Sequence, residues 1–217
     1  MVANLGAANH FDLDDFSALE LDHRLAEEAV HVYVEGYFAL HSPEVARAIT
    51  DLCANQKIGL SFNLNGEYAC RDEGFVRLTL ELLPEVGILF GNRSEFDTFL
   101  PLAEKLTGDL NCRALTRHLL RRSSSPLSNR SSSLTVVMTD GPRSVIVLQL
   151  DPEAHEVTTK IEVDVPSIPE NEIVDTVGAG DSFVAGYLAG FLGGKDRSAC
   201  IRSGVSRKSL VFRLRSN

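Results

Sequence analysis

The residues best suited to chemistry lie near the C-terminal end of the chain, at Gly178, Gly180 and Asp181. Two glycines allow the backbone to turn tightly and keep side chains away from the amides of the turn. An apolar helix is predicted to begin here, and its first N–H groups and the positive end of its dipole favour phosphate binding. Asp181 repels phosphate but is the right group to accept a proton from a hydroxyl that attacks phosphate. The alternative is a glycine turn in which Asp181 only caps the helix.

The stretch Asp175–Phe183, DTVGAGDSF, resembles the C-terminal motif of the PfkB (ribokinase-like) carbohydrate kinases. It differs from a Walker A loop, which needs Gly-Lys-Ser/Thr, and from the dinucleotide motif GxGxxG, because Phe183 occupies the third glycine position. The resemblance implies an anion hole of three consecutive amides, a catalytic base that follows them, and two residues beside the bound nucleotide. In this sequence the anion hole corresponds to Gly178, Ala179 and Gly180, and the catalytic base to Asp181. The two residues beside the nucleotide correspond to Asp175 and Thr176.

Asn92 and Glu95 stand where a predicted strand ends and a helix begins, in the sequence GNRSE. The resemblance implies that this Asn-x-x-Glu pair helps to hold Mg²⁺ through its waters near the phosphates, with Asn92 also beside the nucleotide. The same spacing is that of a capping box, which only satisfies the first amides of the helix. The motif at Gly178–Asp181 favours the functional interpretation.

Three further residues are predicted to line the site. Thr139 and Gly141 follow the predicted strand LTVVMT and resemble the family's Thr-x-Gly segment beside the triphosphate, although a tight turn at DGP explains them equally well. Phe38 lies in GYFALHSPE, which resembles a segment of adenosine kinases whose aromatic ring packs on the purine of the substrate. The alternative for Phe38 is an ordinary core position.

Within the family, the chain resembles the adenosine kinases from Ala3 to about Gly204. The matching segments are ANLGAAN, GYFALHSPE, SFNLN, ILFGNRSEFDTF and DTVGAGDSFVAGYLAG. The resemblance implies a kinase that uses ATP and Mg²⁺ to phosphorylate the 5′-hydroxyl of adenosine, giving AMP in purine salvage. A ribokinase-like sugar kinase and a non-catalytic nucleotide-binding remnant are the alternatives.

The chain departs from the adenosine kinases at both ends. Their N-terminal region, with the lid strands and the groups that grip the ribose hydroxyls, has no counterpart here. The tail at 205–217 also lacks their Gly-Cys/Ala-x-x-Pro segment, and Val177 stands where they usually have Asn. We therefore expect one partial kinase domain over residues 1–217, and an inactive fragment is one interpretation of it.

Composition limits the other classes of function. A chain of 217 residues with 44% hydrophobic content can bury one substantial core. The net charge of −9 argues against nucleic acid and anionic membranes as partners and favours a small-molecule substrate. The resemblance implies that this substrate is adenosine. The four cysteines form no CxxC pair, so neither a zinc site nor a disulfide framework is predicted. We expect a location in the cytoplasm, with the nucleus as a second location. No targeting or membrane segment is predicted, and family members are expected to be monomeric.

The order of the predicted elements indicates an α/β fold. We expect strands at 31–38, 57–64 and 86–92, the first ending in an aromatic loop, and helices at 16–30, 42–55, 71–83 and 94–106, the last broken or kinked near Pro101. Such units imply a mostly parallel sheet, while the alternation in 156–165 suggests an antiparallel edge. Residues 121–133, RRSSSPLSNRSSS, are predicted to form a disordered loop. The expected fold is a ribokinase-like three-layer α/β/α sandwich without its N-terminal part and lid, and its site lies at the carboxyl ends of the strands.

Overall fold

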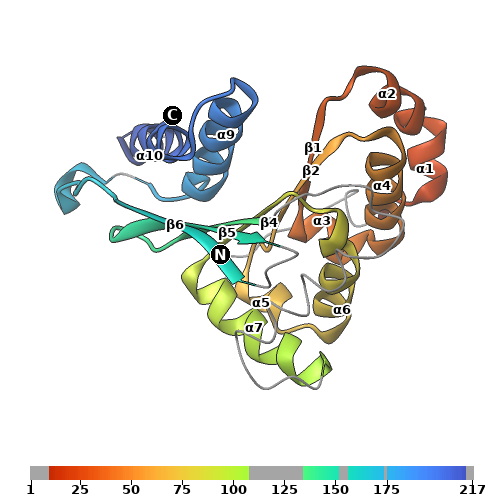
Figure 1. Ribbon diagram of the computed structural model, residues 1–217, viewed down its shortest axis with the longest axis horizontal. Helices are drawn as coiled ribbons and strands as arrows, with labels where there is room; N and C mark the ends of the chain where they lie inside the picture. Colours follow the sequence, from red (N-terminus) through yellow and green to blue (C-terminus); the bar gives the residue numbers. More distant parts are fainter. Residues whose placement is uncertain (1–9, 108–133, 152–155, 174, 214–217) are drawn as a thin grey trace. The chain divides into compact units, whose positions relative to one another are not determined.

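The computed structural model describes residues 10–107, 134–151, 156–173 and 175–213 (Figure 1). Its six strands form one sheet in the order β1-β2-β3-β4-β5-β6. The chain divides into two compact units, of which the first comprises 1–138 with 148–159 and the second 139–147 with 160–217. Each unit has its own helices, which position different parts of the predicted site.

The first unit is built on three parallel strands, as the alternating pattern predicts. They are β1 (His31–Glu35), β2 (Gly59–Asn63) and β3 (Ile88–Asn92). Their register places Val34 beside Phe62, and Phe62 beside Leu89. Because the strands are parallel, their carboxyl ends meet at one edge of the sheet, where side chains from different strands can act together.

Seven α-helices surround these strands among the described residues of the first unit (Figure 1). They are α1 (Leu13–Ala18), α2 (Leu21–Glu28), α3 (Gly36–His41), α4 (Pro43–Gln56), α5 (Glu67–Cys70), α6 (Glu73–Leu82) and α7 (Arg93–Thr107), with a 3₁₀ turn at Leu83–Glu85 after α6. The expected positions of α4, α6 and α7 are confirmed. Pro101 lies inside α7, which runs from Arg93 to Thr107 without the break that proline suggested.

Two local predictions in the first unit are wrong. The helix expected over 16–30 is two helices, because Glu20 takes a left-handed conformation with φ 52° between α1 and α2. The aromatic loop expected after β1 is instead the short helix α3. It ends at His41, and the amide of the following Ser42 donates to the carbonyl of Phe38 over 2.8 Å. The first difference concerns the backbone of one residue and the second a helix of only six residues, and the hydrophobic pattern is insensitive to both.

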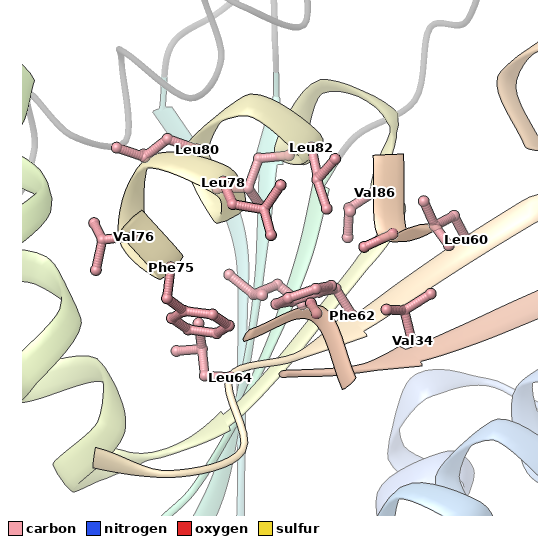
Figure 2. Close-up of a cluster of buried hydrophobic side chains, with 14 of the residues drawn as sticks. Val34, Leu60, Phe62, Leu64, Phe75, Val76, Leu78, Leu80, Leu82 and Val86 are labelled. Atoms are coloured by element: carbon pink, nitrogen blue, oxygen red, sulfur yellow. The ribbon is translucent and has the colours of Figure 1, made fainter. Parts of the chain in front are cut away.

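A central part of the core of the first unit lies between the sheet and α6 (Figure 2). Leu60, Phe62 and Leu64 alternate along the chain at β2 and its end, so they point to the same face of the sheet. The ring of Phe62 lies 6.1 Å from that of Phe75 on α6, in a tilted arrangement. Both phenylalanines are among the largest fully buried side chains of the described residues, so this contact lies at the centre of the core.

Strands β4 (Leu134–Thr139) and β5 (Ser144–Asp151) are joined by a tight turn. In this turn the amide of Asp140 donates to the carbonyl of Ser144 over 2.9 Å, and that of Arg143 to the carbonyl of Asp140 over 3.0 Å. A connection this short makes the two neighbouring strands antiparallel. With β6 (Glu156–Asp164) at the edge, the sheet is mixed, as the alternation in 156–165 predicts.

The second unit carries the long helices α9 (Ala179–Leu192) and α10 (Arg197–Arg213), preceded by a 3₁₀ turn at Glu170–Glu172. The two helices pack closely along each other. The helix α10 continues through most of the tail that departs from the family pattern. Residues 121–133 lie outside the described part of the chain. Within the described ranges, no helix combines the length and apolarity needed to cross a membrane.

The core contact between the sheet and α6 yields a test of stability. Replacing the fully buried Leu64 with alanine is expected to lower the free energy of unfolding by about 2–5 kcal/mol, because transfer and cavity terms add. The matched control is Leu19→Ala, at a position 57% exposed, where the change is expected to stay within about 0.5 kcal/mol. Urea unfolding followed by circular dichroism measures both. Equal losses in the two variants would show that Leu64 is not part of a packed core.

Candidate functional site

The turn before α9 has the conformation that the glycine motif predicts. Gly178 is in the left-handed region, with φ 74°, and no side chain caps the helix. The amide of Val177 donates to Oδ1 of Asp175 over 2.9 Å, and the amide of Ala179 donates to the carbonyl of Thr176 over 3.2 Å. Asp175 and Thr176 therefore shape the turn through local hydrogen bonds, and Gly178 supplies the bend.

The amides that follow in this turn are open to a ligand. Within the part of the chain that the structure describes, neither Gly180 nor Asp181 has an acceptor for its amide. A Cβ added at Gly178 or Gly180 would meet no atom within 4 Å, so nothing in the described chain fills the space above the turn. The helix dipole adds positive potential at this point, and the turn can therefore bind an anion. The exposed carboxylate of Asp181 lies in the first turn of α9, at the edge of this space.

Asn92 and Glu95 form a complete capping box at the start of α7. The amide of Glu95 donates to Oδ1 of Asn92 over 2.9 Å, and the amide of Asn92 donates to Oε2 of Glu95 over 2.7 Å. The side-chain amide of Asn92 also donates to Oε1 of Glu95 over 2.8 Å, and the hydroxyl of Ser94 donates to Oδ1 of Asn92 over 2.7 Å. The structure thus confirms the capping interpretation of this pair.

The environment of Glu95 is compatible with water-mediated contact to Mg²⁺. Its side chain is buried, and this burial raises the pKa of the carboxyl above its ordinary value, while hydrogen bonds from the backbone of Asn92 and Gly66 act in the opposite direction. With three hydrogen bonds accepted from Asn92 and Gly66, the carboxylate keeps one further lone pair that can accept from a metal-bound water. Oδ1 of Asn92 already accepts two hydrogen bonds, so direct ligation by this oxygen fits less well. Among the described residues, no group of three or more His, Cys, Asp or Glu could hold a metal.

Thr139 and Gly141 lie at the turn between β4 and β5. Thr139 ends β4, and Gly141 has φ 56° in the turn. A Cβ added at Gly141 would meet nothing within 4 Å. The tight-turn interpretation of this segment is therefore sufficient for the backbone, and the open space beside Gly141 leaves room for a ligand.

The aromatic residues after β1 differ in their surroundings. Phe38 packs against the core, and its ring lies 6.0 Å from that of Phe11. Its neighbour Tyr37 stacks on Tyr68 of α5, with ring centroids 5.3 Å apart and an interplanar angle of 21°. Tyr68 is 51% exposed, so this pair presents an aromatic surface that Phe38 does not. The sequence indicated this pair only through the aromatic residues of GYF and GEY, because Tyr37 and Tyr68 lie 31 positions apart in the chain.

A polar cluster at the ends of β1 and β2 was not predicted. The side-chain amide of Asn63 donates to the hydroxyl of Tyr33 and to Oδ1 of Asn65, both over 3.0 Å. Asn65 in turn donates to Oε2 of Glu35 over 3.2 Å. The parallel register sets Glu35 beside Asn63, and this pairing explains the cluster. The one sequence signal was the pair of asparagines in SFNLN, at the end of a buried strand.

The predicted site residues fall into two groups. The first unit holds Phe38, Asn92 and Glu95, and brings the last two into direct contact. The second unit holds all the others and gathers five of its residues into one turn. These five are Asp175, Thr176, Gly178, Ala179 and Gly180, with Asp181 directly after them.

Comparison with known proteins shows consistent similarity to one group of kinases. The chain is 30% identical over 213 residues to "Adenosine kinase 1" of Arabidopsis thaliana, an alignment that covers 98% of this chain and 57% of the plant protein. It is also 30% identical over 204 residues to the adenosine kinase of Dictyostelium discoideum, covering 94% and 55% of the two chains. The chain therefore spans a little over half the length of the curated relatives it matches.

Solved structures show the same fold. The adenosine kinase of Anopheles gambiae, in complex with P1,P4-di(adenosine-5) tetraphosphate, matches with a TM-score of 0.78 at 24% identity, covering 97% of this chain and 58% of that one. The enzyme of Schistosoma mansoni, in complex with 2-fluoroadenosine, matches with a TM-score of 0.79 at 21% identity and the same coverage. The expected ribokinase-like α/β fold is confirmed. The family model described as pfkB family carbohydrate kinase matches residues 1–211, and the chain belongs to this family.

Proposed function

We propose that this chain carries the phosphate-binding turn and the catalytic base of an ATP-dependent adenosine kinase, which phosphorylates the 5′-hydroxyl of adenosine to give AMP. The observation that carries the proposal is the turn before α9. There Gly178 has a left-handed backbone conformation, and the amides of Gly180 and Asp181, which have no acceptor among the described residues, lie next to the carboxylate of Asp181 in sequence. Relatives with the printed name adenosine kinase at 30% identity support the choice of acceptor.

In the proposed reaction, Asp181 accepts the proton of the acceptor hydroxyl as its oxygen attacks the γ-phosphorus of ATP. The bond to the β-γ bridging oxygen breaks, and ADP leaves. The amides of Gly178, Ala179 and Gly180 donate to the oxygens of the transferring phosphoryl group, where negative charge accumulates. The amide of Ala179 would exchange its turn hydrogen bond with Thr176 for one to the ligand.

Asn92 and Glu95 are proposed to hold Mg²⁺ through its waters. The ion, when bound, neutralises charge on the phosphates during transfer. Glu95 would accept a hydrogen bond from a metal-bound water with the lone pair that Asn92 and Gly66 leave free. Asp175, Thr176, Thr139 and Gly141 are proposed to line the nucleotide.

The purine of adenosine is proposed to contact the aromatic segment after β1. Phe38 was the residue predicted from the sequence, and its half-buried ring packs against the core. The stacked pair Tyr37 and Tyr68 offers a more exposed aromatic surface at the same segment. We further propose that the intact protein is a monomer with no nucleic-acid or membrane partner, acting in purine salvage in the cytoplasm, with the nucleus as a second location.

The role of Asp181 is tested in a chimera that joins this chain to the N-terminal part of an adenosine kinase. Asp181→Asn is expected to lower kcat about 10²–10⁴-fold and to leave ATP affinity nearly unchanged, because only proton transfer is lost. Steady-state kinetics and nucleotide titration measure the two quantities. The matched control is Asp51→Asn, on the exposed face of α4, which should retain full activity. A variant at Asp181 with normal turnover would remove this residue from the role of base.

The two interpretations of Glu95 are separated by Glu95→Gln in the same chimera. Glutamine can complete the capping box, so stability is expected to change little. A neutral amide attracts Mg²⁺ and its waters less, so the Mg²⁺ concentration for half-maximal activity should rise several-fold. Activity is measured against Mg²⁺ concentration, and stability by thermal unfolding. Unchanged dependence on Mg²⁺ would leave helix capping as the only function of Glu95.

The chain of 217 residues tested alone is expected to bind ATP weakly and to show no adenosine phosphorylation. It spans only 57% of its plant relative, and fixing an acceptor in line with the γ-phosphate supplies about 7–11 kcal/mol of barrier reduction in well-oriented reactions. A coupled assay of ADP release is run with adenosine, with ribose and with no acceptor. Adenosine-dependent turnover of about 1 s⁻¹ or more would show that the chain is a kinase by itself. Turnover with ribose alone would favour a sugar kinase.

A further inference from the structure

The second unit contains a cavity of about 560 Å³ between α9 and α10, away from the turn at Gly178–Asp181. On the α9 side it is lined by Gly186, Ala189 and Gly190. Gly186 lies five residues after Asp181 and Gly190 nine, which corresponds to about 7.5 and 13.5 Å along a helix axis. The cavity therefore faces the C-terminal half of α9 and not its N-terminal amides.

Glycines on α9 let the two helices pack closely beside this cavity. A Cβ added at Gly186 would lie 2.6 Å from the carbonyl oxygen of Ser203, and one at Gly190 would lie 3.2 Å from Cα of Cys200. The backbones of α9 and α10 thus approach closely at these two glycines. The longer side chains of α10 extend beside the contact and form the other wall of the cavity.

The other wall is strongly basic. Arg202 and Arg207 of α10 and Lys195 of the preceding turn line the cavity, and all three side chains are exposed. Within the described part of the chain none of these three cations forms an ion pair. Nζ of Lys195 lies 3.4 Å from Oγ of Ser203, which also lines the cavity.

The basic charge of this segment contrasts with the net negative charge of the whole chain. Residues 195–217 hold seven of the 21 Lys and Arg residues and a single acid, Asp196, in a protein of net charge −9. The carboxylate of Asp196 accepts the amide of Ala199 over 2.9 Å, so it caps α10, and it is absent from the lining of the cavity. The cavity is therefore a local concentration of positive charge on an acidic protein.

We propose that this cavity binds the phosphate group of a small phosphorylated molecule, at a site separate from the turn before α9. Two arginine forks can donate in pairs to phosphate oxygens, and Lys195 adds a compact charge. The hydroxyls of Ser203 and Ser206 supply further donors at the wall. A volume of about 560 Å³ is that of a small-molecule site, which favours a metabolite over a macromolecule.

The test uses inorganic pyrophosphate as the probe and the full chain of 217 residues. Isothermal titration gives the dissociation constant, and amide shifts in ¹H–¹⁵N spectra locate the binding. We expect shifts within residues 195–207 in addition to any at 178–181, because the open turn is itself an anion site in the proposed function. Sulfate at the same ionic strength serves as the control for unspecific charge attraction.

Arg202→Gln is expected to weaken binding to the cavity at least about tenfold, since a charge-assisted pair is lost. Ala189→Glu, at an exposed lining position, places a carboxylate in the cavity and should abolish this binding while circular dichroism stays unchanged. The matched control is Arg197→Gln, on the same helix but outside the lining, with an expected change below about threefold. Shifts confined to 178–181, or equal affinity of Arg202→Gln and the unaltered chain, would overturn the proposal. Equal binding of sulfate would reduce the site to unspecific attraction of anions and overturn it as well.

Discussion

The first amides of an α-helix have no acceptors inside the helix, and α7 and α9 meet this constraint in opposite ways. At α7, the side chain of Asn92 accepts the backbone amide of Glu95, and the side chain of Glu95 accepts the backbone amide of Asn92. At α9, Gly178 bends the chain without providing a side-chain cap, and the amides of Gly180 and Asp181 have no acceptor within the described part of the chain. One helix end is thus closed by a carboxylate, while the other is free to receive negative charge from a ligand.

The hydrophobic pattern was sufficient to predict most of the fold. The runs at β2 and β3 are mostly apolar because these two strands are almost wholly buried, and the helices between the strands keep helical spacing. The pattern could not reveal the break at Glu20, because a single left-handed residue leaves the spacing of apolar residues almost unchanged. The helix α3 was missed for a related reason, since six residues give less than two turns of periodicity.

The candidate site was predictable where its residues are neighbours in sequence. The glycine turn and the pair Asn92 and Glu95 are local motifs, and their geometry follows from a few consecutive dihedral angles. The stack of Tyr37 on Tyr68 and the contact of Asn65 with Glu35 depend instead on how β1 and β2 are aligned. Register is decided by the packing of the whole sheet, so no short motif contains this information.

The contact between α9 and α10 restricts how this part of the chain can change over evolution. A methyl group at Gly186 would collide with the backbone of α10, and one at Gly204 would lie 2.7 Å from the ring of Phe183. Neither helix can therefore accept a larger residue at its contact position while the other keeps its place. Substitutions that move the helices apart would also change the shape of the cavity between them. A change at Gly186 or Gly204 would therefore also change the positions of the basic side chains that line the cavity.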